Sequence, residues 1–166
     1  VPKKNLLFAL KGLSRVRVPV VFSIYGPFED TDYWARCEAM ITKLPDHIQV
    51  CAYGAVDTSQ VMQALSQQDL FFLPTLGENY GHVIAEALMA GCVVITSDQT
   101  PWGDLNLFDS GWAISLEDKE IFTEKLEELY KMNINNFKLK KNSVYNYVKT
   151  KINNKDTINS YLDFLS

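Results

Sequence analysis

Apolar runs rich in β-branched and aromatic residues recur along the chain up to residue 114 and predict buried strands. These runs lack the alternation of a half-exposed strand, so we expect both faces of each strand to be covered, as in a parallel sheet. Glycine or proline follows several of them and ends the strand. The predicted strands are Val18–Tyr25, Ile48–Tyr53, Leu70–Leu73, Cys92–Thr96 and Trp112–Ile114.

Segments with apolar residues three or four positions apart separate these strands and predict helices. Strands that alternate with helices indicate an α/β fold: a Rossmann-like, open, doubly wound parallel sheet with helices on both faces. Ligands of such folds bind beyond the carboxyl ends of the strands. The predicted helices are Asn5–Leu13, Asp32–Lys43, a segment from Thr58 to Gln67, Tyr80–Ala90 and Asp118–Met132.

The composition changes after Met132, where asparagine and lysine become frequent and large apolar side chains become rare. Two weakly amphipathic, peripheral helices are expected there, at about 136–148 and 155–165. The chain is therefore divided into a main domain, residues 1–132, and a C-terminal helical part, residues 133–166. We expect the second part to pack on the first or on a domain that precedes it.

Length and charge exclude several classes of function. The chain of 166 residues has the size of one domain, and its net charge of −4 argues against nucleic-acid binding. No apolar stretch is long enough to span a membrane, so no integral membrane segment is expected. Cys37, Cys51 and Cys92 are odd in number and widely spaced, which is typical of reduced core thiols. With only two histidines and no clustered cysteines, no metal site is predicted.

Two carboxylates, Glu78 and Glu86, lie on either side of the start of the helix predicted at Tyr80–Ala90. A helix N-terminus attracts anions such as phosphate, and the loop Asn79–His82 adds further backbone N–H groups. Carboxylates repel phosphate but accept hydrogen bonds from hydroxyl groups. The pattern therefore fits a ligand with a central diphosphate and a hydroxyl-rich group at each end, as in a nucleotide-sugar.

A simpler interpretation fits the spacing of the two acids equally well. Glu78 would be a favourable acid before a helix N-terminus, worth about 0.3–1 kcal/mol, and Glu86 a solvated helix residue. The surroundings of Glu86 argue against the second part, because its neighbours from Val83 to Met89 are apolar. A charge in such a helix needs a partner or a cleft.

The segment Pro74–Ile95, P-T-L-G-E-N-Y-G-H-V-I-A-E-A-L-M-A-G-C-V-V-I, resembles the hallmark of family 4 of the retaining, Leloir-type glycosyltransferases, which have the GT-B fold. That hallmark is Glu-x-aromatic-Gly, four residues and a second Glu, between two buried strands. Pro2–Leu6 is similar to the end of a basic loop of that family, and Ile24–Pro27 and Tyr53–Val56 are similar to two of its strand ends. The resemblance covers residues 1–132.

The resemblance implies two catalytic residues: Glu78, which would hold the donor sugar, and Lys4, which would neutralise diphosphate charge. Glu86 would accept hydrogen bonds from the ribose hydroxyls, and the loop around Val56 would meet the nucleobase. Taken alone, Lys4 reads as a surface lysine and Gly26 as a turn residue, so both assignments rest on the resemblance. The implied donor-binding residues are Gly26, Val56, Thr75, Asn79, Tyr80, Gly81, His82 and Glu86.

The resemblance also implies partners and a location. The donor would be a nucleotide-sugar such as a UDP- or GDP-sugar, with no further cofactor. A GT-B active site lies between two domains, and the match begins inside the first loop of the second. We therefore expect an N-terminal acceptor-binding domain in the same polypeptide, and no transfer by this part alone. We expect a cytoplasmic protein, held peripherally at the inner membrane when the acceptor is lipid-linked.

The predicted function is thus to bind the donor of a retaining glycosyltransferase of polysaccharide biosynthesis, which moves a hexose-type sugar to a saccharide or lipid-linked acceptor. Two other interpretations stay open: a non-catalytic nucleotide- or phosphate-binding module, and a nucleotide-sugar epimerase of the same fold. The sequence contains neither G-x-G-x-x-G nor a P-loop, which weakens the dinucleotide and triphosphatase versions of the first.

Overall fold

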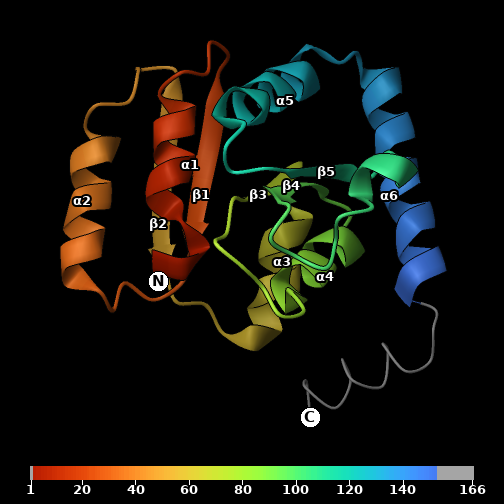
Figure 1. Ribbon diagram of the computed structural model, residues 1–166, viewed down its shortest axis with the longest axis horizontal. Coiled ribbons are helices and arrows are strands. Elements are labelled where there is room, and N and C mark those ends of the chain that lie inside the picture. Colours follow the sequence, from red (N-terminus) through yellow and green to blue (C-terminus); the bar gives the residue numbers. More distant parts are fainter. Residues whose placement is uncertain (1, 153–166) are drawn as a thin grey trace.

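Within the part of the chain that the structure describes, five strands form two parallel ladders, and helices flank them (Figure 1). The computed structural model describes residues 2–152. In one ladder β1 pairs with β2, and in the other β4 lies between β3 and β5. The predicted α/β fold is confirmed. The strands are β1 (Val20–Tyr25), β2 (Ile48–Gly54), β3 (Leu70–Leu73), β4 (Val93–Ser97) and β5 (Gly111–Ile114).

The hydrogen bonding divides the strands into two ladders where the sequence predicts one sheet. Side chains join the two ladders, since the rings of Phe22 on β1 and Phe72 on β3 lie 6.4 Å apart between centroids. β4 is buried along its whole length. Its side chains reach both apolar clusters, since Val94 belongs to one and the next residue, Ile95, to the other.

The helices fall into two groups, one for each apolar cluster. α1 lies beside α2 and α5, while α4 lies beside α3 and α6 (Figure 1). Short 3-10 turns, η1 (Pro2–Lys4) and η2 (Leu105–Phe108), complete the described elements. The helices are α1 (Leu6–Leu13), α2 (Thr31–Ile41), α3 (Thr58–Ser66), α4 (His82–Met89), α5 (Lys119–Lys131) and α6 (Ile134–Ile152).

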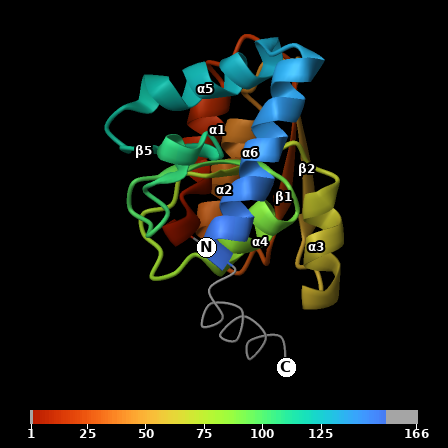
Figure 2. The ribbon, with the colours of Figure 1, turned by 90° about the vertical axis from the view of Figure 1, so that its right-hand side faces the viewer.

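The last described helix, α6, is longer than the sequence predicts and crosses the face of the molecule that Figure 2 turns toward the viewer. It begins at Ile134 because the Asn133 side chain caps it by accepting from the backbone N–H of Asn136, 2.9 Å away. Val144 and Tyr147 are fully buried against the cluster that contains α4, so the expectation of a peripheral helix is wrong for this face. The second predicted helix, 155–165, lies outside the described residues, and the division at residue 132 stays a prediction.

Candidate functional site

The tip of α4 is shaped by a glycine in the left-handed conformation. Gly81 is the N-cap, with φ 77°, and α4 begins at His82, two residues later than the sequence predicts. The Gly81 carbonyl accepts hydrogen bonds from the N–H groups of Ile84 and Ala85, so the first turn is well formed. No side chain caps this end. The first N–H groups of a helix have no partner within it, and they give its tip an affinity for anions.

Glu78 lies in the loop before this tip and is paired with Lys4. Its Oε1 accepts from the Lys4 ammonium at 2.7 Å and from the Thr75 hydroxyl at 2.9 Å. The Glu78 side chain is 11% exposed and that of Lys4 is 42% exposed. Partial burial opposes ionisation of Glu78, but the hydrogen bonds from Lys4 and Thr75 outweigh it and hold the pKa of this carboxyl below its usual value. Glu78 is therefore an anion at neutral pH.

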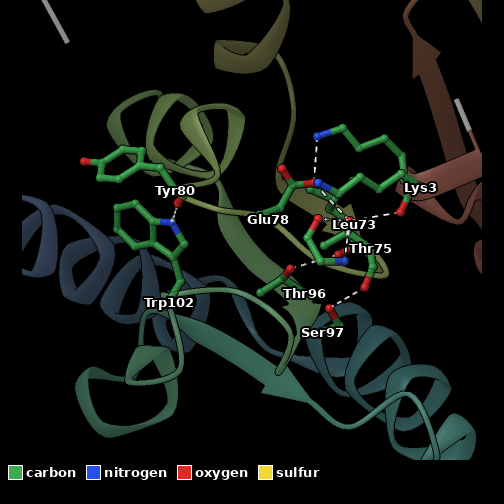
Figure 3. Close-up of polar contacts among 10 residues, drawn as sticks. Lys3, Leu73, Thr75, Glu78, Tyr80, Thr96, Ser97 and Trp102 are labelled. Carbon is green, nitrogen blue, oxygen red and sulfur yellow. Dashed lines mark hydrogen bonds and ion pairs between the residues drawn. The ribbon is translucent and has the colours of Figure 1, made fainter. Parts of the chain in front are cut away.

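A set of hydrogen bonds holds the loop that carries Glu78 (Figure 3). Thr75 is fully buried, and its hydroxyl lies within hydrogen-bond distance of the Lys3 carbonyl, 3.0 Å, as well as of Glu78. The Leu76 N–H also donates to the Lys3 carbonyl, at 2.9 Å. The Ser97 hydroxyl at the end of β4 donates to the Thr75 carbonyl at 2.6 Å. Residues from the start of the chain and from two strand ends thus fix one short loop.

The tip of α4, Glu78 and Lys4 border a cleft of about 500 Å³. Glu86, in the second turn of α4, faces it and is 8% exposed. The cleft therefore combines an anion-attracting helix tip, basic side chains beside it and two carboxylates. Its lining within the described part of the chain is Lys3, Lys4, Glu78, Asn79, Tyr80, Gly81, His82, Val83 and Glu86.

Most of the residues predicted for the site meet in this cleft, and three do not line it. Thr75 lies behind Glu78 and contacts it directly. Gly26 and Val56 follow β1 and β2, and the Gly26 N–H donates to the Gly54 carbonyl at 2.7 Å, which ties those two strand ends to each other. Their ladder is not hydrogen-bonded to the one that carries Glu78, so the expected meeting of all loops at one edge is only partly seen. The roles assigned to the ten residues stay predictions.

Sequence reasoning did not select Lys3 or Val83, which line the cleft. Lys3 could have been suspected as the neighbour of Lys4. The segment 100–104, which follows β4, is not part of the lining. Its Trp102 instead lies behind the loop and donates from Nε1 to the Tyr80 carbonyl at 2.7 Å (Figure 3).

The described residues lack the features of two other kinds of site. Between residues 2 and 152, no cluster of three or more histidine, cysteine or acidic side chains is arranged to hold a metal ion. Within the same residues, no helix has the length and apolarity needed to cross a membrane.

The comparison with protein families decides what kind of domain this is. The model of the glycosyl transferases group 1 matches residues 1–146. The chain belongs to this family. The match extends past residue 132 into α6, in agreement with the burial of that helix in the core. Among curated protein sequences no significant match was found.

Several solved structures share the fold of this group 1 domain. A structure of Anabaena Alr3699/HepE with UDP and glucose has a TM-score of 0.79 at 16% identity, covering 99% of this chain and 45% of that one. WaaG, a glycosyltransferase involved in lipopolysaccharide biosynthesis, has a TM-score of 0.71 at 16% identity, covering 90% of this chain and 40% of WaaG. The pneumococcal O-GlcNAc transferase GtfA with UDP and GlcNAc has a TM-score of 0.69 at 18% identity, with 99% and 33% covered. The group 1 domain thus spans less than half of each of these proteins.

Proposed function

We propose that this group 1 domain binds the nucleotide-sugar donor of a retaining glycosyltransferase. The complete enzyme would transfer a hexose-type sugar to a saccharide or lipid-linked acceptor, and an acceptor-binding domain of the same polypeptide would close the other side of the cleft. Three structures of the same fold were solved with UDP, UDP-glucose or UDP and glucose, which supports a nucleotide-sugar as the ligand class.

One observation carries the proposal: a single cleft holds the tip of α4, Lys4 and two carboxylates. The helix tip and Lys4 would bind the diphosphate, because N–H dipoles and an ammonium both stabilise phosphate charge. The same groups would stabilise the charge that develops when the nucleoside diphosphate leaves. No metal ion is needed in this proposal, since protein groups supply the positive charge.

The two carboxylates would bind hydroxyl groups on opposite sides of the diphosphate. Lys4 and Thr75 both bond to Oε1 of Glu78, and we assign the other oxygen, Oε2, to a hydroxyl of the donor sugar. Glu86 would accept from the ribose hydroxyls. Its position in the second turn of α4, one turn behind the tip, suits a group next to the diphosphate.

Calorimetric titration with UDP, GDP and their sugars tests the proposal. Lys4→Ala and Glu86→Gln should each weaken binding by about tenfold or more, the effect of losing one charged hydrogen bond. Matched controls are Lys138→Ala and Glu124→Gln, which remove exposed charges on α6 and α5 outside the cleft. The proposal is wrong if the wild-type domain binds none of these ligands, or if the cleft variants bind as tightly as the controls.

The reaction itself distinguishes the three interpretations given by the sequence. In the complete polypeptide, a transferase consumes donor only when acceptor is present, and retention leaves the transferred sugar with the anomeric configuration of the donor. An epimerase would convert the donor without acceptor, and a binding module would convert nothing. NMR of the products identifies which of these occurs.

A further inference from the structure

Trp102 packs against the backbone of the cleft loop without lining the cleft itself. It is 4% exposed, and its indole Nε1 lies 2.7 Å from the Tyr80 carbonyl oxygen. A Cβ added to Gly81 would lie 3.2 Å from the same Nε1. The indole is therefore in close contact with the peptide unit that joins Tyr80 to Gly81 (Figure 3).

This contact fixes the direction of a backbone N–H group. In a trans peptide the carbonyl and the N–H point in opposite directions. Because the Tyr80 carbonyl is bonded to the indole, the Gly81 N–H points away from Trp102, and Gly81 itself lines the cleft. A second bond, from the Glu78 N–H to the Gln99 carbonyl at 3.0 Å, holds the other end of the loop against the same segment.

Two side chains of α6 hold this segment in turn, through Asp104. Asp104 accepts from the Tyr147 hydroxyl at 2.7 Å, and its two oxygens lie 2.8 and 2.7 Å from the Lys151 ammonium. The Lys151 ammonium is also 5.7 Å from the Trp102 ring. Burial opposes ionisation of Asp104, but the bonds from Lys151 and Tyr147 outweigh it, and its pKa lies below the usual value. The cluster of Asp104, Tyr147 and Lys151 thus ties α6 to Trp102.

We propose that Trp102 is a positioning residue for the diphosphate: its indole N–H orients the Tyr80–Gly81 peptide so that the Gly81 N–H meets the anion. The cluster of Asp104, Tyr147 and Lys151 keeps Trp102 in place, so α6 acts on the donor site without touching the ligand. This inference rests on the proposed function, because the diphosphate is the ligand assigned there.

The test compares a ligand that carries the diphosphate with one that does not. Trp102→Phe keeps an aromatic ring and removes the N–H. NMR titration with UDP or GDP, whichever binds the wild type more tightly, should show roughly tenfold weaker binding. Binding of the matching nucleoside should be unchanged, because a nucleoside does not reach the helix tip. The matched control is Trp34→Phe, on α2, which should leave both affinities as in the wild type.

A second variant keeps the test decisive if Trp102→Phe does not fold. Asp104→Asn retains an acceptor for Tyr147 but removes the charge that pairs with Lys151, and it should weaken diphosphate binding severalfold with nucleoside binding unchanged. Equal losses for both ligands would assign Trp102 a purely structural role and overturn the inference, as would no loss in either variant. Wild-type protein that binds no nucleoside diphosphate would instead refute the proposed function, and the inference with it.

Discussion

Gly81→Ala tests how tightly the cleft loop is built. Gly81 has φ 77°, a conformation that costs a non-glycine residue about 1 kcal/mol. The added Cβ would also lie 3.1 Å from Cδ1 of Ile84 and 3.2 Å from Nε1 of Trp102. Ile84 can rotate its methyl group away, but the buried indole can move only with its neighbours, which adds about 1–2 kcal/mol. The free energy of unfolding should therefore fall by about 2–3 kcal/mol.

Gly91→Ala is the matched control for this substitution. Gly91 has φ 84°, similar to that of Gly81, and lies at the other end of α4, where an added Cβ meets no atom within 4 Å. Gly91→Ala should lower the free energy of unfolding only by the backbone strain, about 1 kcal/mol. Urea denaturation of both variants measures the difference, which corresponds to about 2–8 °C in Tm for a chain of this size. Equal losses in the two variants would refute the close packing of Trp102 against Gly81.

Two further predictions concern charged side chains. The pKa of Glu78 is lowered in the folded state, so its contribution to stability is complete above its unfolded value of 4.5 and is lost as the pH falls through the folded value. Glu78→Gln should accordingly lower the free energy of unfolding by about 1 kcal/mol near pH 7 and by progressively less below about pH 4.5. Urea denaturation at several pH values measures this loss, and a loss independent of pH would contradict the prediction. Lys140 is 3% exposed, bonded to Asp109 at 2.6 Å and 4.0 Å from the centre of the Trp112 ring. Lys140→Ala should lower the free energy of unfolding by about 2 kcal/mol, and Lys140→Met by less than half of that, because Met keeps the apolar stem. Equal losses in the two variants, measured by urea denaturation, would assign the stabilisation to the charge.

The spacing of apolar residues predicted the strands and helices well, because this signal lies within each element. Every predicted strand and helix within residues 2–152 overlaps an observed one. The errors are at the ends of helices, where one capping hydrogen bond or one backbone angle decides which residue begins the helix. The Asn133 side chain starts α6 earlier than its apolar spacing indicates, and the left-handed Gly81 delays the start of α4.

Glu78 and Glu86 are close in sequence, so their spacing could predict that they lie near each other, and both line the cleft. Contacts between distant segments could not be read from spacing. The bond from Trp102 to Tyr80 joins two separate loops, and the bonds from Lys151 and Tyr147 to Asp104 depend on how α6 packs. No local pattern specifies either arrangement. The same limit applies to Gly26 and Val56, whose distance from the cleft depends on how the two ladders are joined.

The ion pair between Lys4 and Glu78 has a consequence for which ligands stay bound. An anion that draws Lys4 away leaves Glu78 with the Thr75 hydroxyl as its remaining bonded partner among those described here. A free nucleoside diphosphate offers Glu78 no replacement at that position, and the partly buried carboxylate loses stabilisation. An intact donor of the proposed class brings a phosphate for Lys4 and a sugar hydroxyl for Glu78 together. The exchange of partners would thus favour uptake of donor and release of the spent nucleotide.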